Sequence, residues 1–518
     1  MSSRKEDKNM PCTTLLVGKN ASYDGSTIMA RNEDTPNGMF NVKKFVVVQP
    51  ADQPRHYKSV CSHIELELPD DPIRYTCVPD SVRQDGVWGE AGINAANVAM
   101  TATETITTNA RVLGADPYVA LQPAKGKPGE PGYVPEVPGG IGEEDLVTIV
   151  LPYVKTAREG ALRLGSLLEK YGTYEPNAIG FCDGDEIWWL ETVGGHHWIA
   201  KRVPDDCYVT MPNQLGIDEF DLIDAEGDRK NYMCSSDLRQ FIKDNHLNTN
   251  IDGDQDHFNP RDVFGSRSDL DHVYNTPRAW FMQRYLNPYD EDWDNPQALH
   301  TPESDDIPWS RSPERKISIE DVHYCMAGHY QSTVYDPYGP KGDKVSRKLY
   351  RPIGINRTSE LSVLQIRPYA GESYRAIQWV AYGSIPYATL LPIYTNVDKS
   401  VDYIEGARAK VDTNYLYWQD RLIACMADAH FSSMEMDLSN YQLDTLAIGH
   451  NDVMHTDALI KEKGLEGAGM DDKEVHEILE DANEKLCAQI KEATDELLEK
   501  VIYSASMQMN NSFYLSDN

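Results

Sequence analysis

The apolar positions of this chain change their spacing several times along its length. In the first hundred residues they form short β-branched runs or alternate with polar positions, which is typical of strands. The spacing becomes helical over 146–153 and 157–171, and strand-like runs return between 180 and 211. This order of strands, helices and strands predicts an α+β protein and fits a four-layer αββα sandwich.

The C-terminal part of the chain is predicted to be helical. Residues 403–430 have a helical pattern, and from 472 to 501 apolar residues recur every three or four positions. The second pattern predicts one long amphipathic helix. We expect it to dock on its own domain, because about four heptads are few for a coiled coil with a partner chain. The chain therefore divides into a core over 12–400 and a helical region over 401–518 packed on that core.

Two segments of the predicted core have the composition of insertions. Residues 117–142 contain six prolines and many glycines, which predicts a loop. Such a loop covers the active site in some enzymes, but a surface insertion without a role is an equal alternative. Residues 218–318 begin acidic and mixed and end rich in proline, serine and acidic residues. We expect this second insertion to add surface loops to the core.

The first two strands are predicted to form a hairpin. Residues 13–17 and 26–30 are apolar and β-branched, and the residues of 20–25 between them favour turns. Two registers are compatible with this pattern. The turn consists either of the last two residues of the 20–25 segment or of the whole segment, in which case Lys19 pairs with Ser26.

The choice of register decides what surrounds the first cysteine. In the short-turn register Arg31 faces Gly18. In the long-loop register Cys12 lies opposite Glu33, which puts Arg31 and Asp34 beside the Cys12 thiol. A thiol at the start of a strand, next to a cation and a carboxylate, is what an N-terminal nucleophile requires. The cation favours the reactive thiolate, and a free α-amino group is a general base near neutral pH.

Cys12 has no free α-amino group as encoded, because Met1 to Pro11 precede it. Removal of the initiator methionine alone leaves ten of these residues in place. We therefore predict that residues 1–11 are a propeptide removed by self-cleavage. In this reaction the Cys12 thiol attacks the Pro11 carbonyl group, and water then hydrolyses the thioester. The alternative is that Cys12 is an inert buried thiol near a chain terminus.

Charge and composition narrow the classes of function. The chain has 49 Lys and Arg against 82 Asp and Glu, a net charge of −33, which disfavours binding to nucleic acid or to anionic membranes. The sequence contains no run of eighteen apolar residues, so no membrane span is predicted. The polar first eleven residues argue against a secretory signal, so a cytoplasmic protein is expected. The nine scattered cysteines, without a C-x-x-C pair, indicate reduced thiols.

No metal site is expected. The 248–253 segment resembles the front of an EF-hand loop, but Asn259 occupies the position where a bidentate carboxylate closes the calcium shell. His196 and His197 are adjacent, and neighbours on a strand point to opposite faces. We expect this histidine pair to serve packing and hydrogen bonding.

The residues around Cys12 resemble a known family. CTTLLVGKNASYDGSTIMARNEDTP, over 12–36, looks like the start of the C69 peptidases. These belong with the choloylglycine hydrolases and penicillin V acylases among the N-terminal nucleophile (Ntn) hydrolases. Further segments resemble the same family, in family order: 88–94, 102–105, 142–145, 191–198, 212–214, 275–278 and 357–360.

The resemblance implies a fold and a catalytic set. The fold is the four-layer αββα sandwich of Ntn hydrolases, with added loops and a C-terminal amphipathic helix. Cys12 is implied as nucleophile, Arg31 as the group that favours its thiolate, and Asp34 as the group that orients the amine. Asn213 matches the family's oxyanion asparagine and Arg278 its late active-site arginine. Without the resemblance each residue has a structural alternative. Arg31 and Asp34 would form a surface ion pair, Asn213 would be a turn residue, and Arg278 would begin a helix.

The resemblance also implies the substrate. Glu104 lies where choloylglycine hydrolases have an asparagine near the oxyanion, and a carboxylate there would bind the free ammonium group of a dipeptide. Asn97 is the second implied substrate residue. The alternative to this substrate-binding role is that Glu104 points to solvent or pairs with Arg111. We expect a homo-oligomer that cleaves small peptides without a cofactor. An N-acyl amide hydrolase and a non-catalytic homologue like the secernins remain alternatives.

Overall fold

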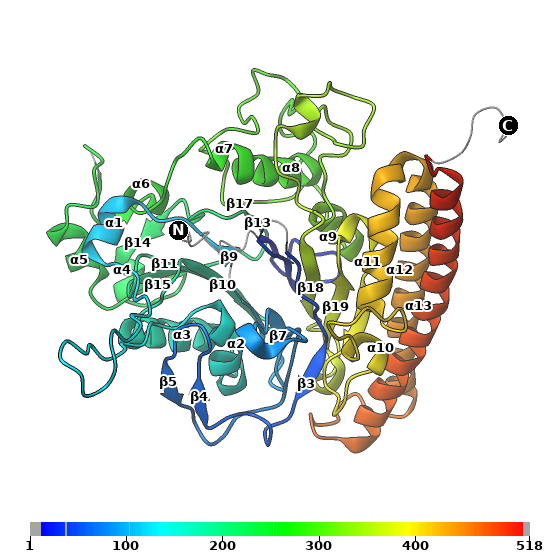
Figure 1. Cartoon of the computed structure of the whole chain (residues 1–518), viewed down its shortest axis with the longest axis horizontal. Helices are drawn as coiled ribbons and strands as arrows, with labels where there is room; N and C mark the ends of the chain where they lie inside the picture. The colour runs from blue at the N-terminus through cyan, green and yellow to red at the C-terminus, as the bar shows by residue number, and fades with distance from the viewer. Residues whose placement is uncertain (1–11, 37–38, 103, 252, 511–518) are drawn as a thin grey trace.

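The computed structural model describes residues 12–36, 39–102, 104–251 and 253–510, without the side chains of Asp85 and Glu104. The predicted propeptide, 1–11, lies outside the described residues. The chain forms an α+β protein in which two sheets lie between groups of helices (Figure 1).

The first sheet has seven antiparallel strands and contains the predicted hairpin. Its strands, in spatial order, are β17 (Ser310–Arg311), β13 (Tyr208–Met211), β1 (Thr13–Val17), β2 (Thr27–Asp34), β18 (Thr358–Ile366), β19 (Ala376–Tyr382) and β20 (Leu391–Tyr394). Thr14 pairs with Arg31 and Val17 with Ile28. This is the long-loop register, so that prediction is confirmed.

The second sheet is built from the middle of the chain. Its strands, in spatial order, are β15 (Tyr232–Cys234), β12 (Trp198–Arg202), β11 (Ile187–Thr192), β10 (Asn177–Cys182), β8 (Ala99–Thr101) and β7 (Ala91–Ile93), with β9 (Glu104–Thr105) also paired to β10. The strand β15 belongs to the segment predicted as an insertion, and so does β17 of the first sheet. That segment therefore contributes strands to both sheets.

Adjacent residues on the strands point to opposite faces, and this alternation separates the hydrophobic core into layers. Leu16 and Met29 of the first sheet pack against Trp189 and Ile199 of the second, which makes the core between the sheets. The other face of each sheet is covered by helices.

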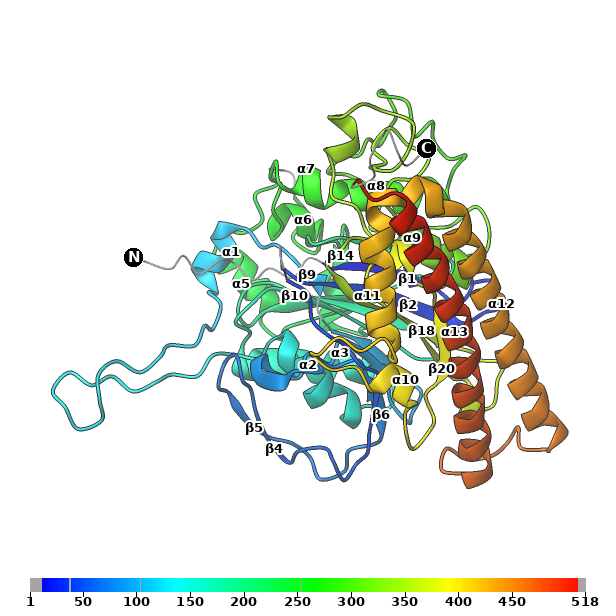
Figure 2. The ribbon, with the colours of Figure 1, turned by 45° about the vertical axis from the view of Figure 1, so that its right-hand side comes forward.

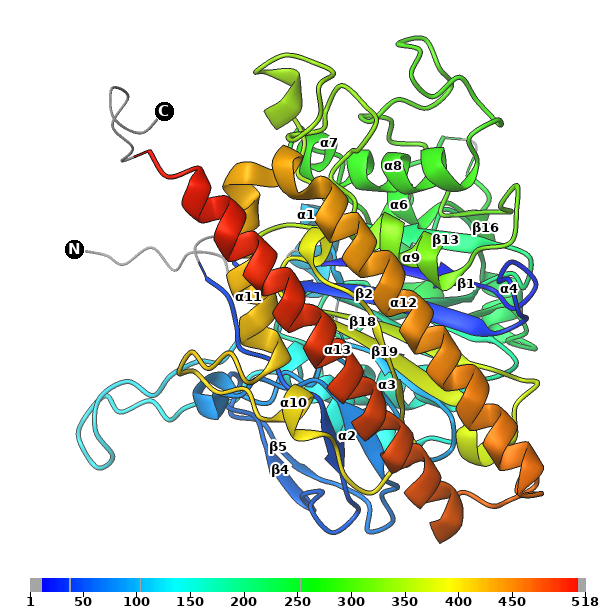
Figure 3. The same ribbon diagram turned by 90° about the vertical axis from the view of Figure 1, so that its right-hand side faces the viewer.

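The helices divide between these two outer faces. On the second sheet α2 (Glu143–Val150) and α3 (Ala157–Tyr171) share a cluster with β10 and β11, at the positions where two helices were predicted. The first sheet is covered by α8 (Thr276–Leu286), α9 (Ile319–Met326), α12 (Phe431–Glu462) and α13 (Lys473–Met507). Figure 3 shows α12 and α13 lying across the strands of the first sheet.

The helical C-terminal region packs on the core, as its buried residues show. The predicted helix over 403–430 is wrong as one element. It is two helices, α10 (Asp402–Glu405) and α11 (Leu416–Ala427), separated by the non-helical residues 406–415. Gly406, which caps α10, packs against the Tyr415 ring with no room for a Cβ atom. α13 covers the stretch where the long amphipathic helix was predicted. α12 lies within the region predicted to be helical, but it was not predicted as a separate element.

The remaining elements are short. Three strand pairs flank the sheets: β3 (Val46–Val48) with β6 (Tyr75–Cys77), β4 (His56–Lys58) with β5 (Glu65–Glu67), and β14 (Phe220–Asp221) with β16 (His257–Phe258). The other α-helices are α1 (Ala110–Ala115), α4 (Leu222–Glu226), α5 (Leu238–Asp244), α6 (Pro260–Val263) and α7 (Asp271–Tyr274). No helix of the described residues has the length and apolar character that crossing a bilayer requires.

The proline- and glycine-rich segment 117–142 is a loop, as predicted. Its two sides are joined by two isolated bridges, Gln122 with Val137 and Lys125 with Val134, and by a hydrogen bond from the Gly140 N–H to the Val119 carbonyl oxygen at 2.8 Å. Figure 2 shows it as a long arm that projects away from the body of the protein. The tip of the arm therefore does not cover either sheet.

Candidate active site

Cys12 directly precedes β1 and lies in a row of inward-facing residues across the first sheet. Continuing the strand registers places Asn213 on one side of Cys12 and Glu33 on the other, and Glu360 lies beyond Glu33. Directly opposite residues of antiparallel strands share a face. The side chains of Cys12, Glu33 and Glu360 have no exposed surface. The sequence has thus placed a thiol and two carboxyl groups side by side in the interior.

Arg31 holds the thiol from the next position on the same face of β2. Its Nη2 atom donates a hydrogen bond to Cys12 Sγ at 2.9 Å and another to Glu143 Oε1 at 2.6 Å, and its Nη1 atom donates to Glu90. Burial alone would lower the pKa of Arg31, but the neighbouring Cys12, Glu90 and Glu143 outweigh burial and raise this pKa well above its ordinary value. Arg31 is therefore a permanent cation in contact with the thiol.

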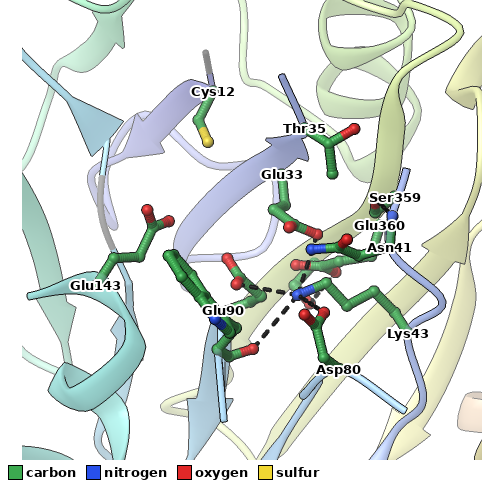
Figure 4. Close-up of polar contacts among 12 residues, drawn as sticks. Cys12, Glu33, Thr35, Asn41, Lys43, Asp80, Glu90, Glu143, Ser359 and Glu360 are labelled. Atoms are coloured by element: carbon green, nitrogen blue, oxygen red, sulfur yellow. Dashed lines mark hydrogen bonds and ion pairs between the residues drawn. The ribbon is translucent and has the colours of Figure 1, made fainter. Parts of the chain in front are cut away.

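Glu90 connects Arg31 to a second buried cation. One Glu90 oxygen accepts from Arg31, and the other, Oε1, accepts from Lys43 Nζ at 3.0 Å. Lys43 has no exposed surface and also lies 2.7 Å from Asp80 Oδ1 and 3.2 Å from Glu33 Oε2. Figure 4 shows these carboxyl groups gathered around the Lys43 ammonium group. The charges beyond the thiol thus form one connected network.

Carboxyl groups outnumber cations in this network, and several of the carboxyl groups have raised pKa values. Burial raises the pKa of Glu33 well above its ordinary range, although Lys43 opposes the shift. Burial, assisted by the charge of Glu90, also raises the pKa of Glu143, against the effect of Arg31. The pKa of Glu360 is raised by burial to about 8. Part of this group is therefore protonated at neutral pH.

Arg278 secures the backbone on the other side of the nucleophile. It lies in the first turn of α8, is fully buried, and its Nη1 atom donates to the carbonyl oxygen of Cys12 and, at 2.6 Å, to Thr13 Oγ1. Its Nη2 atom donates to Asn213 Oδ1 at 2.6 Å. Asn213 Nδ2 in turn donates to the carbonyl oxygen of Thr105 at 2.9 Å. The structure thus brings Arg278 and Asn213 together with Cys12.

Asp34 ends β2 next to these residues but belongs to a different set of contacts. Its carboxyl group accepts hydrogen bonds from Arg351 and from the Thr358 hydroxyl group. The preceding residue, Glu33, faces the interior between the sheets, and neighbours on a strand alternate. The Asp34 side chain is therefore held on the Arg351 side of the strand.

The two predicted substrate residues are placed differently. Asn97 lies in the turn between β7 and β8, at the opposite end of β7 from Glu90, and its amide group donates to the Glu372 carbonyl oxygen at 3.0 Å. The structure does not bring Asn97 to Cys12. Glu104 pairs with Ala178 through its backbone, but its side chain lies outside the described residues.

Glu90, Glu143 and Lys43 belong to the site but were not predicted from the sequence. Glu90 and Glu143 do lie within segments that resemble the family. Glu143 begins α2, where the helix dipole favours a carboxylate. Glu90 and Trp88 adopt left-handed backbone conformations, with φ of 59° and 51°, which non-glycine residues rarely do. Such conformations gather at functional sites, and here they flank the carboxylate that binds Arg31.

Comparisons with known proteins agree over nearly the whole chain. The family model for peptidase family C69 matches residues 11–444. The chain is 56% identical to a dipeptidase of Bifidobacterium longum (strain NCC 2705), over 98% of this chain and 100% of that one. It is 51% identical to a probable dipeptidase A of Streptococcus pyogenes serotype M3 and 41% identical to dipeptidase A of Lactobacillus helveticus, again over 98% of this chain and 100% of each relative.

Proposed function

Because the chain belongs to peptidase family C69, we propose that it is a dipeptidase whose nucleophile is the Cys12 thiolate, exposed by self-cleavage after Pro11. The observation that carries this proposal is the 2.9 Å hydrogen bond from Arg31 to Cys12 Sγ in a fully buried setting. A cation in direct contact with a thiol favours the thiolate, which is the form that attacks carbonyl groups. A dipeptide substrate is supported by the names of relatives that match this chain over its length.

The proposed reaction starts from the processed chain. The α-amine of Cys12 takes the thiol proton, and the thiolate attacks the carbonyl carbon of the dipeptide. The peptide bond breaks, the departing amino acid takes that proton on its nitrogen, and a thioester remains on Cys12. Water, deprotonated by the same amine, hydrolyses the thioester and regenerates the thiol.

The neighbouring residues have supporting roles in this proposal. Asn213 keeps a second N–H beside the one it gives to Thr105, and this donor serves the oxyanion. Arg278 fixes the carbonyl group of Cys12, so that the nucleophile has one position. Asp34 does not face the thiol as predicted, because its carboxyl group lies on the opposite face of β2 from Glu33. We assign to it the orientation of the backbone amine of Cys12, which its position at the end of the neighbouring strand allows. The two sheets between helices are consistent with an Ntn hydrolase fold.

Intact mass and activity of Cys12→Ala test the proposal. The variant should fold, keep Met1 to Pro11, and hydrolyse no dipeptide, whereas the wild-type chain loses these residues. Cys77→Ala is the matched control and should be processed and active, because burial raises the pKa of that thiol to about 12. Turnover by Cys12→Ala would require another nucleophile. A wild-type chain that keeps its first eleven residues and hydrolyses nothing would favour the non-catalytic alternative.

The pH dependence tests the base. With the α-amine of Cys12 as base, kcat/KM should rise through an apparent pKa near neutrality. Asp34→Asn should slow both self-cleavage and turnover. A rate that is flat between about pH 5 and 9 would remove the amine from the mechanism. A homo-oligomer in the cytoplasm also stays a proposal, which gel filtration and fractionation of cells test.

A further inference from the structure

Two carboxyl groups beside Cys12 have oxygens with no partner. Among the described residues, neither Glu33 Oε1 nor Glu360 Oε1 has a hydrogen-bond partner, although both residues are fully buried. Glu360 Oε2 accepts from Ser362 Oγ at 2.8 Å, and Glu33 Oε2 faces Lys43 at 3.2 Å. A buried polar oxygen without a partner is costly, and an ammonium ligand that donates to both oxygens would satisfy them and favour the ionised form of both carboxyl groups.

The cations of the site are already engaged elsewhere. Arg31 binds Cys12, Glu90 and Glu143, and the three carboxyl partners of Lys43 surround it. The cations of the network therefore leave these two oxygens to a donor from outside it. No group of three or more His, Cys, Asp or Glu side chains within the described ranges has the arrangement of a metal site. An organic cation fits the two free oxygens better than a metal ion does.

The distance from Cys12 fits one particular cation. Glu33 lies one strand away from the nucleophile and Glu360 two strands away, and neighbouring strands are about 4.8 Å apart. In a dipeptide the α-nitrogen lies about 2.5 Å from the scissile carbonyl carbon. When that carbon contacts Cys12 Sγ, the ammonium group therefore falls within reach of Glu33 on the adjacent strand. Glu360 lies directly opposite Glu33 on the next strand, so both carboxyl groups face the same space. Figure 4 shows the Glu33 carboxyl group between the Cys12 thiol and Lys43.

We propose that Glu33 and Glu360 form the subsite that binds the free α-ammonium group of the substrate. Each contributes one oxygen to a charge-assisted hydrogen bond, while Lys43 and Ser362 hold the other oxygens in place. This subsite rests on the proposed function and gives it a substrate class: peptides with an unblocked amino end, cut after their first residue.

The test compares two substrates that differ only in the ammonium group, alanyl-leucine and propionyl-leucine. In the wild-type protein kcat/KM should be at least about 100-fold higher for alanyl-leucine. In Glu360→Gln this ratio should fall about 10-fold or more, through loss of alanyl-leucine turnover, with propionyl-leucine unchanged or improved. Glu33→Gln should act in the same direction. Glu191→Gln, a buried glutamate of β11 whose partners are Trp189 and two backbone amides, is the matched control and should keep the ratio.

The outcomes separate this subsite from the proposed function. A Glu360→Gln protein that is folded and processed but keeps the wild-type ratio within about twofold would overturn the subsite alone. Equal wild-type rates on alanyl-leucine and propionyl-leucine would also overturn the subsite, even if neither glutamine variant folds. Activity of Cys12→Ala, or a wild-type protein that hydrolyses neither substrate, would overturn the proposed function and the subsite with it.

Discussion

Removing Lys43 should destabilise the protein in a way that depends on pH. In Lys43→Met the side chain keeps its length but loses the charge that three carboxyl groups contact within 3.2 Å. Breaking a buried ion pair by removing one partner costs about 3–5 kcal/mol, because the remaining charge is buried without compensation. Unfolding of a chain of 518 residues has an entropy of about 1.1 kcal/mol/K, at about 2.1 cal/mol/K per residue. The expected loss in Tm is therefore about 3–5 °C near neutral pH.

The sign of the pH dependence follows from Glu33. Its pKa in the folded protein lies above its ordinary value because of burial, and Lys43 limits this shift. Without Lys43 the folded pKa rises further. A carboxyl group whose folded pKa is raised costs stability above its unfolded pKa, and the cost grows until the pH reaches the folded pKa. The deficit of Lys43→Met should thus be small near pH 5, where carboxyl groups take up protons, and large near pH 8.

Calorimetry in the Cys12→Ala background, at about pH 5.5 and 8, measures the loss in Tm without interference from self-cleavage. The matched control is Lys201→Met. Lys201 is also buried, but its partner Glu219, 3.0 Å away, is mostly exposed, so water can compensate the lost charge. We expect less than half the effect of Lys43→Met. A Tm equal to that of the parent at pH 8, or a deficit that grows toward pH 5, would refute the reasoning.

Three further predictions concern single positions. Arg278→Gln should lower kcat about 100-fold with little change in KM, because the carbonyl group of Cys12 loses its hydrogen-bond donor. Steady-state kinetics measure both constants, and an unchanged kcat would contradict the positioning role of Arg278. Burial lowers the pKa of His323 to about 4, so the wild-type protein should lose up to about 3 kcal/mol as the pH falls from 6.5 to 4, and His323→Gln should lose less in the same thermal scans. A Cβ atom at Gly92 would lie 1.8 Å from the Thr76 carbonyl oxygen, so Gly92→Ala should cost at least about 3 kcal/mol in unfolding experiments, whereas Gly114→Ala, with open space, should be neutral.

Local chemistry allowed the hairpin and its register to be predicted from the sequence. The turn residues of 20–25 and the β-branched runs beside them are adjacent in the chain, so their pairing involves only short-range information. The same holds for Arg31, which reaches Cys12 through that register. Lys43 and Glu90 could not be predicted in this way, because the contacts between them depend on how separate strands and loops fold together.

Helix α12 was missed for a different reason. Its buried residues are spread over 32 positions and include Thr445, Thr456 and Gly449 among the apolar ones. The buried face is therefore not marked by a run of strongly hydrophobic residues, and the periodic signal is weak. In α13 the buried positions are mainly apolar, among them Leu479 and Leu486, and the same kind of helix was predicted there.

The arm over 117–142 makes this protein suited to division into two complementing pieces. Next to its tip, the Lys125–Gly126 bond is exposed and offers a trypsin cleavage site. A cut there leaves Cys12 and Arg31 on the first fragment and Arg278 on the second. The fragments are interleaved, since β1 pairs with β13, β2 with β18 and β8 with β10. Neither fragment holds a complete site, so the two halves, expressed separately and fused to interacting proteins, would act as a split reporter whose signal depends on their reunion.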